Sequence, residues 1–280
     1  MSQYNEMPAT KKLICVAGLP RAGSTLLCQL LGQHPQIYST GHSSPLPHSL
    51  SAIRSAVSND QFLLAQLDGE FDLVYLRLQN AYRGFINGWF VETERPLVVD
   101  KNHAWLGLLD VLVDFNPEFR VIVCIRELSQ IYGSLEAQHQ KTRLIDSEDG
   151  FAGLTPLARA AHFFNEGGAV GRGLMAIQAA MEDYPQVVRD RILYVRFEDL
   201  VHQAPAVFDE ILGFIGADTF ALDPEHLPVY PSESDSHYHW KYRHNTHPSI
   251  MPLQSHVIPE RVTQYLRNLY PWWYQSFYDQ

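Results

Sequence analysis

The sequence predicts an α/β fold of three layers, in which helices cover both faces of a central parallel sheet. Apolar runs rich in β-branched residues alternate along the chain with segments of helical periodicity, which is typical of parallel sheets. The first apolar run ends in a turn bracketed by Gly18 and Gly23 and opens directly into a helical segment, the layout of a phosphate-binding loop. These two observations predict an α/β protein with an anion site near its amino terminus.

The hydrophobic pattern assigns the individual elements. Apolar runs predict strands at 13–17, 97–101, 119–125 and 192–197, with a short extended piece at 36–39. Helical periodicity predicts helices at 24–33, 60–89, 104–114, 128–142 and 156–184, and one that begins near 205. The 60–89 segment is expected to form one or two helices that cover the sheet. Glycines at 167, 168, 171 and 173 weaken the 156–184 helix or mark a break in it.

Composition limits the class of protein. The chain has 280 residues, 46% of them hydrophobic, so we expect one globular domain over 1–280, with a flexible amino terminus at 1–11 and a helical insertion at 60–90. The net charge of −10 disfavours nonspecific binding to nucleic acid or anionic lipid, although it allows a local basic pocket. Residues 1–12 contain no apolar signal core, and no apolar stretch is long enough for a membrane span, so we expect a cytoplasmic protein. The three cysteines lie in apolar runs, which predicts buried thiols.

The turn from Gly18 to Thr25 is a candidate anion site. Its glycines let successive backbone N–H groups point inward, and the helix that follows adds unpaired donors and the positive end of its dipole. The spacing matches the Walker A pattern G-x4-G-K-[ST], except that Ser24 replaces the lysine and the cation lies inside the loop at Arg21. This arrangement suits a smaller anion better than the β- and γ-phosphates of a kinase substrate. The alternative is a tight turn that binds no ligand.

Polar residues follow the other predicted strands at the point where each one ends. Lys101 and His103 stand at the end of one strand, Arg126 follows the next, and Glu198 follows the last. Ligands of parallel α/β sheets bind beyond the carboxyl ends of the strands. We therefore expect these side chains to converge with the glycine turn on one site.

The loop Pro20-Arg21-Ala22-Gly23-Ser24-Thr25 resembles the P-[KR]-S-G-[ST]-[ST] segment of sulfotransferases that use 3′-phosphoadenosine 5′-phosphosulfate (PAPS), with Ala22 in place of the usual serine. The overall pattern is similar to that of bacterial-type stand-alone enzymes with a P-loop-like fold. The resemblance implies that the side chain of Arg21 and the backbone of the loop hold the 5′-phosphosulfate. The residues concerned are Arg21, Ala22, Gly23, Ser24, Thr25 and Leu26.

A second element resembles the same family. Arg126 at the end of a strand and Ser134 eight residues later have the spacing that the family uses for the 3′-phosphate of PAPS. A guanidinium offers a rigid fork of donors, and the hydroxyl on the following helix adds one more. Outside this context, an arginine after a strand is usually a surface or salt-bridge residue.

Two further segments extend the resemblance. Tyr194–Leu200 is similar to the family's Y-x-x-[YF]-E-D-[LM] segment, which makes Phe197 a candidate for stacking on adenine. Glu198 and Asp199 in the same segment suit capping of the next turn. The family also has a basic loop that covers the nucleotide. We expect its equivalent within 230–250, with Lys241 and Arg243 as candidate phosphate ligands.

The segment Lys101-Asn102-His103 resembles the K-x-H segment of the cytosolic small-molecule sulfotransferases. The resemblance implies that His103 removes the proton of the acceptor hydroxyl and that Lys101 contacts the transferring group. An imidazole suits proton removal near neutral pH, and a cation suits the charge that builds on the leaving phosphate oxygen. We therefore expect His103 to be the general base; the alternative is a hydrogen-bonded structural histidine.

A second histidine, His42, is a rival for the same role. Protein-tyrosine sulfotransferases and related bacterial enzymes place a glutamate after the helix that follows the loop, and Gly41-His42-Ser43 occupies a comparable place without a carboxylate. This departure argues against a tyrosine-sulfating enzyme.

The pair His237-x-His239 has no third ligand at a suitable spacing, so no metal site is expected.

The residues and the resemblance together predict transfer of the sulfuryl group of PAPS to a hydroxyl of a small-molecule or peptide acceptor, with release of adenosine 3′,5′-bisphosphate (PAP). A hydroxylated or phenolic small molecule is favoured, because an acidic chain repels a highly sulfated polysaccharide. Two alternatives stay open. One is a P-loop kinase, which the serine in the lysine position disfavours, and the other is a catalytically silent nucleotide-binding or scaffolding protein.

Overall fold

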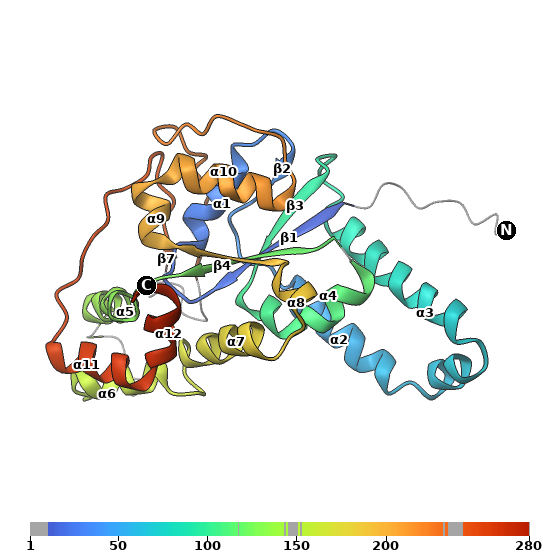
Figure 1. Cartoon of the computed structure of the whole chain (residues 1–280), viewed down its shortest axis with the longest axis horizontal. Helices are drawn as coiled ribbons and strands as arrows, with labels where there is room; N and C mark the ends of the chain where they lie inside the picture. Colours follow the sequence, from blue (N-terminus) through green and yellow to red (C-terminus); the bar gives the residue numbers. More distant parts are fainter. Residues whose placement is uncertain are drawn as a thin grey trace.

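The structure of the protein is a computed structural model, which describes residues 11–116, 118–142, 144, 151, 153–231, 233–234 and 243–279. At its centre, these residues form a sheet of five strands in the order β2-β3-β1-β4-β5 (Figure 1). The strands are β1 (Lys12–Gly18), β2 (Ile37–Tyr38), β3 (Leu97–Lys101), β4 (Arg120–Ile125) and β5 (Ile192–Arg196). All neighbouring pairs run parallel, which confirms the predicted sheet.

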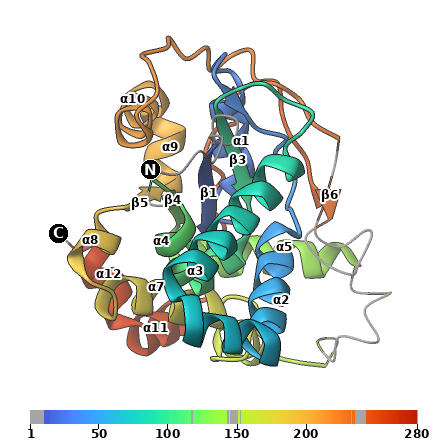
Figure 2. The ribbon, with the colours of Figure 1, turned by 90° about the vertical axis from the view of Figure 1, so that its right-hand side faces the viewer.

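Helices cover both faces of the sheet (Figures 1 and 2). In Figure 1, α1 (Ser24–Gly32), α9 (Phe197–His202) and α10 (Ala204–Ile215) lie above it. Below it lie α4 (Leu109–Phe115), α7 (Gly171–Glu182) and α8 (Gln186–Arg189), with the 3-10 helix η1 (His103–Leu108) packed on β1. A further group is formed by α5 (Leu128–Thr142), α6 (Pro156–Phe164), α11 (Glu260–Leu269) and α12 (Pro271–Phe277). The three-layer prediction is confirmed.

The core lies on the central strands. Residues 13–17 of β1 and 121–125 of β4 are at most 1% exposed, because a parallel sheet with helices on both faces buries every side chain of its inner strands. Cys15, Cys28 and Cys124 lie in this core as buried free thiols, as predicted.

The segment predicted as a sheet-covering helix at 60–89 forms α3 (Gln61–Trp89), but it packs mainly against α4 and α2 (Leu46–Ser58). Of its side chains, Val74 and Ile86 are buried, whereas Phe62 and Phe71 are 81% and 59% exposed. Figures 1 and 2 show the first half of α3 standing apart from the sheet. The expected covering role is therefore wrong for this half.

No helix in the described part of the chain is both long and apolar enough to cross a membrane.

Two helix assignments also differ from the sequence pattern. The helix α2 had no predicted counterpart; it buries Leu46, Pro47 and Leu50, and its later apolar residues Ile53 and Val57 are only half-buried. The predicted 156–184 helix is broken between α6 and α7. A Cβ on Gly168 would lie 2.3 Å from the carbonyl oxygen of Phe163, so the chain reverses direction there at a distance that only glycine allows.

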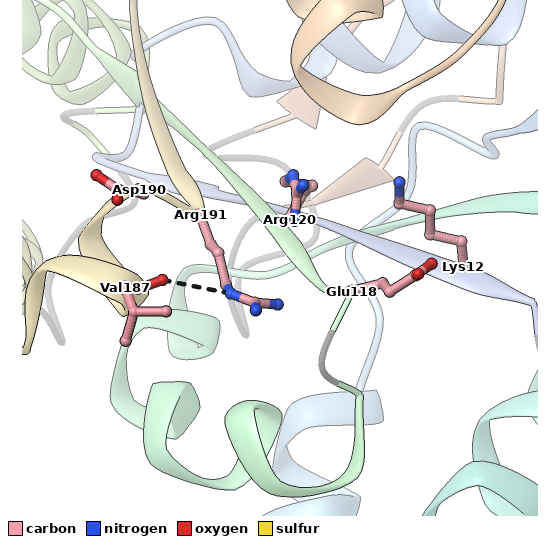
Figure 3. Close-up of a pocket in the computed structure, with 6 residues that line it drawn as sticks. All are labelled: Lys12, Glu118, Arg120, Val187, Asp190 and Arg191. Carbon is pink, nitrogen blue, oxygen red and sulfur yellow. Dashed lines mark hydrogen bonds between the residues drawn. The ribbon is translucent and has the colours of Figure 1, made fainter.

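Cationic residues mark the amino-terminal edge of the sheet. Lys12 begins β1 and Arg120 begins β4, and Figure 3 shows them beside a pocket of about 410 Å³ that Arg191 also lines. The ammonium of Lys12 donates to the carbonyl oxygen of Ile215 at 2.7 Å, and Nε of Arg120 donates to that of Phe214 at 3.1 Å. Both cations thus bind the last carbonyl groups of α10, where the helix dipole is negative.

The end of β1 lies in close contact with β4. Gly18 has φ +123°, and a Cβ at this position would lie 2.1 Å from the carbonyl oxygen of Cys124. Immediately after it, the backbone N–H of Leu19 donates to the same oxygen at 3.2 Å. The glycine is therefore required for the chain to leave the sheet directly beside β4.

Gly18→Ala is expected to lower the free energy of unfolding by about 3 kcal/mol or more, because it adds both a clash and an unfavourable φ. Urea denaturation measures this loss. The control is Gly84→Ala within α3, where an added Cβ has no atom within 4 Å; a gain of about 0.5–1 kcal/mol is expected there. Equal stability of the two variants would contradict the contact between β1 and β4.

Candidate active site

The predicted phosphate loop connects β1 to α1. Its backbone has two left-handed positions, Arg21 with φ 65° and Gly23 with φ 91°. Helix α1 begins directly after Gly23, and among the described residues no side chain caps it and no acidic residue occupies its first turn. The first N–H groups of a helix have no partner within the helix. The loop therefore presents the donors of 24–26, with the positive end of the helix dipole, to an anion.

Lys101 supplies a cation to this loop from a neighbouring strand. It is the last residue of β3, is only 4% exposed, and is the register partner of Val16 in β1. Its ammonium lies 3.3 Å from Oγ1 of Thr25, in the first turn of α1. Ser24 occupies the sequence position of the Walker lysine, and Lys101 compensates in space for the missing charge.

Arg126 and Ser134 are each hydrogen-bonded to Arg21 of the loop. Nη1 of Arg126 donates to the carbonyl oxygen of Arg21 at 3.0 Å, and Nε of Arg21 donates to Oγ of Ser134 at 3.0 Å. Burial lowers the pKa of Arg126, and the nearby Arg21 lowers it further. Its buried Nε has no hydrogen-bond partner among the described residues. Two close guanidinium groups with an unused donor form a site that suits a dianion such as phosphate.

Phe197 packs between the loop and Arg126. A Cβ on Gly23 would lie 2.3 Å from Cδ2 of the Phe197 ring, and the guanidinium of Arg126 lies 4.6 Å from the ring centroid. The ring therefore holds the guanidinium in place by a cation–π contact. Its predicted stacking on adenine stays a prediction.

Glu198, which lies near Arg126, supports the start of α5. Oε1 of Glu198 accepts from the backbone N–H of Glu127 at 3.2 Å, and the hydroxyl of Tyr278 donates to Oε2 of Glu198 at 3.2 Å. Asp199 pairs with Arg196 at 2.6 Å. Neither carboxylate caps α9 or α10 through a side-chain hydrogen bond, so the predicted capping of the next turn is wrong. Glu198 instead binds the N-terminal end of another helix.

A cleft of about 960 Å³ opens beside the loop and contains His103. Asn102 fixes the start of η1, since its Oδ1 accepts from the N–H of Ala104 at 2.8 Å and its Nδ2 donates to the carbonyl oxygen of Ser44 at 2.6 Å. The exposed His103 follows directly and lines the cleft with Gly18 and Pro20 of the loop. The predicted base is thus placed beside the anion site.

His42 has a different environment. It is half-buried, its backbone N–H donates to Oγ1 of Thr40 at 3.3 Å, and it is not among the residues that line the cleft. Of the two histidines, only His103 is among the described residues that line the cleft. Lys241 lies outside the described residues, and Arg243 is placed by its strand β7 (Arg243–His244), which pairs with β6 (Glu233–Ser234).

Several residues of the site carry no sequence motif. The cleft is also lined by His48, His162 and Arg172 from α2, α6 and α7. His256 lies near the arginine pair, since burial, Arg126 and Arg21 all lower its pKa. Its backbone exchanges two hydrogen bonds with the side-chain amide of Gln130, at 2.8 and 3.2 Å. Only the folded chain brings these residues to the site.

The described residues include no cluster of three metal-ligating side chains.

Asp100 ties η1 to the end of β3. Its Oδ1 accepts from Nε1 of Trp105 at 2.7 Å in the core. Burial raises its pKa to about 6, although hydrogen bonds with Ser44 and Trp105 oppose the shift. The carboxylate therefore holds the segment that carries His103 at a cost in stability near neutral pH.

Asp100→Asn is expected to be more stable than the wild type at pH 7 and similar to it near pH 4. A carboxyl whose pKa is raised by folding stabilises the fold when protonated, and this contribution falls by roughly 3 kcal/mol as the pH rises from about 4 to about 6. Asparagine has no such titration. Urea denaturation across pH 4–8 tests this, with the exposed Asp209→Asn as control. A pH-independent difference between variant and wild type would refute the assignment.

The chain is similar to several known proteins. A profile described as "Sulfotransferase family" matches residues 14–221. The sulfotransferase domain from the curacin biosynthetic pathway superimposes with a TM-score of 0.51 at 16% identity, covering 93% of this chain and 98% of that chain. The sulfotransferase domain from the Synechococcus PCC 7002 olefin synthase gives 0.45 at 20% identity, covering 78% of each chain. The sulfotransferase from Alicyclobacillus acidocaldarius gives 0.49 at 15% identity, covering 76% of this chain and 84% of that chain.

No curated protein sequence matches the chain. The likeness to the curacin domain shows a shared fold. The family profile covers most of the chain, including the phosphate loop, Lys101, Arg126 and Ser134. The chain therefore belongs to the sulfotransferase family.

Proposed function

We propose that the protein transfers the sulfuryl group of PAPS to a hydroxyl of a small-molecule acceptor and releases PAP. The observation that carries this proposal is the cluster of Arg21, Arg126 and Ser134 next to an uncapped helix N-terminus with Lys101. These are two adjoining anion sites, which suits a nucleotide with phosphate groups at both its 3′ and 5′ positions.

The two sites divide the donor between them. The N–H groups of 24–26 and the ammonium of Lys101 would hold the 5′-phosphosulfate. The guanidinium of Arg126 and the hydroxyl of Ser134 would hold the 3′-phosphate, with the side chain of Arg21 directed to the same hydroxyl. Lys241 and Arg243 are proposed to close over this phosphate, and Phe197 to contact the adenine.

The transfer itself requires a base and a stabilised leaving group. His103 would take the proton of the acceptor hydroxyl as its oxygen attacks sulfur in line with the S–O bond that breaks. The electron pair of that bond passes to the phosphate oxygen of PAP. Lys101 and the loop N–H groups would stabilise the charge that develops there. A single strand end and the turn that follows thus provide both Lys101 and His103.

The test of this function is the recognition of the 3′-phosphate. Isothermal titration calorimetry with PAP, AMP and ATP is expected to show the tightest binding for PAP. Arg126→Gln should weaken PAP binding by about 10- to 100-fold more than it weakens AMP binding, since a hydrogen bond to a charged group contributes roughly 1.5–3 kcal/mol. Ser134→Ala should have a smaller effect of the same kind. The exposed Arg189→Gln is the matched control.

Other results would lead to other functions. Preference for ATP over PAP would indicate a phosphoryl-transferring enzyme. Failure to bind any of the three nucleotides would indicate a catalytically silent scaffold. If Arg126→Gln lowered the affinities for PAP and AMP equally, Arg126 would not be the residue that binds the 3′-phosphate.

The base is tested with paired histidine variants. His103→Asn should lower kcat by about 10²- to 10⁴-fold, the usual range for loss of a general base, and leave PAP affinity unchanged. His42→Asn should retain most of the activity. Turnover is measured with radiolabelled PAPS and a phenol that a screen shows the wild type to accept. The reverse outcome would make His42 the base.

A further inference from the structure

We propose that the natural acceptor is a hydroxy acid with an apolar body, whose carboxylate binds Arg172. This inference rests on the proposed function and assigns the chemical class of its second substrate. It is based on three features of the cleft: the position of Arg172, the charges that surround it, and the apolar wall.

Arg172 lies close to the phosphate loop. It is in the first turn of α7, and the next residue, Gly173, packs directly on the loop. A Cβ on Gly173 would lie 2.9 Å from Cδ2 of Leu19 and 3.8 Å from the carbonyl oxygen of Gly18. The exposed side chain of Arg172 lines the same cleft as His103. A ligand in this cleft can therefore reach both residues.

The charges of the cleft favour an anion. Although the chain contains 31 acidic residues, no aspartate or glutamate is among the described residues that line the cleft. Its titratable side chains are His48, His103, His162 and Arg172. Within the described part of the chain, the side chain of Arg172 has no hydrogen bond or ion pair, whereas Arg159 and Arg196 each pair with a carboxylate.

An exposed arginine that is not paired with a carboxylate of the described residues is suited to bind a planar anion. The guanidinium binds a carboxylate through two parallel hydrogen bonds, which fixes the orientation of the ligand as well as its charge. Anchoring one end of the acceptor at Arg172 would hold its hydroxyl near His103, and such positioning lowers the entropic barrier of the transfer.

Part of the cleft wall is apolar. It includes Leu135, Phe151, Phe163 and Ala176. The rings of Phe151 and Phe163 lie 5.0 Å apart, and that of His162 lies 4.8 Å from Phe151 at an edge-to-face angle of 87°. This surface can cover an aromatic or aliphatic body. The acceptor class is therefore an amphipathic hydroxy acid rather than a sugar.

Matched ligand pairs test the inference. The probes are 4-hydroxybenzoate, 4-hydroxyphenylacetate and 3-(4-hydroxyphenyl)propionate, each compared with its uncharged amide by calorimetry in the presence of saturating PAP. For the wild type, at least one acid should bind about 10-fold more tightly than its amide, the effect of one charge-assisted pair. Arg172→Gln should remove this advantage and leave amide binding unchanged. Arg172→Lys should retain part of it.

The control is Arg77→Gln on the exposed face of α3, which makes the same change of charge away from the cleft and should keep the preference for the acid. The inference fails if no acid binds more tightly than its amide, or if Arg172→Gln weakens both members of a pair equally. If PAP binds and uncharged phenols are sulfated at the same rate as the acids, the proposed sulfotransferase function stands, but the carboxylate site at Arg172 is wrong. If PAP does not bind, the proposed function and the inference about the acceptor are both wrong.

Discussion

The site depends on the contact between the end of β1 and β4. At Gly18 the two backbones approach more closely than any side chain allows, and the chain then bonds to the carbonyl oxygen of Cys124 as it turns. Arg126 follows β4 by one residue, so this contact fixes its distance to the loop. Its guanidinium can then hold the carbonyl oxygen of Arg21, whose positive φ is retained only because neighbouring contacts support it. The geometry of the anion site is therefore set by the backbone of the sheet.

The strand order explains how positive charge reaches a phosphate loop that lacks the Walker lysine. β1 lies between β3 and β4, so cations reach the loop from both neighbours, Lys101 from one strand and Arg126 from the other. Ser24 is free to be small because the charge is supplied by residues that are distant in sequence. A lysine on the loop itself moves with the loop, whereas Lys101 is held by a buried strand end. Charges that are fixed in this way need little reorganisation to stabilise an anion.

Sequence patterns predicted the strands and the loop because these depend on local signals, namely continuous apolar runs and paired glycines. The convergence of Lys101 and Arg126 followed from the rule for parallel sheets. Other features depend on which surfaces the chain covers, and one sequence does not contain that information. Phe62 has a helical spacing that suits a core position, yet no layer covers it. Arg172 and His256 are brought to the site by α7 and by the segment that packs on α5, and neither lies in a motif.

The two edges of the sheet show why charge alone does not identify a binding site. Lys12, Arg120 and Arg191 form a cationic cluster at the amino-terminal edge, but Glu118 and Asp190 line the same pocket (Figure 3). Two of these cations also donate to backbone carbonyl groups of α10, so their charge stabilises a helix end. At the carboxyl edge Glu198 lies near Arg126, but its oxygens accept from the backbone N–H of Glu127 and the hydroxyl of Tyr278. The location of the carboxylates, and not the net charge of the chain, therefore determines the local potential at each edge.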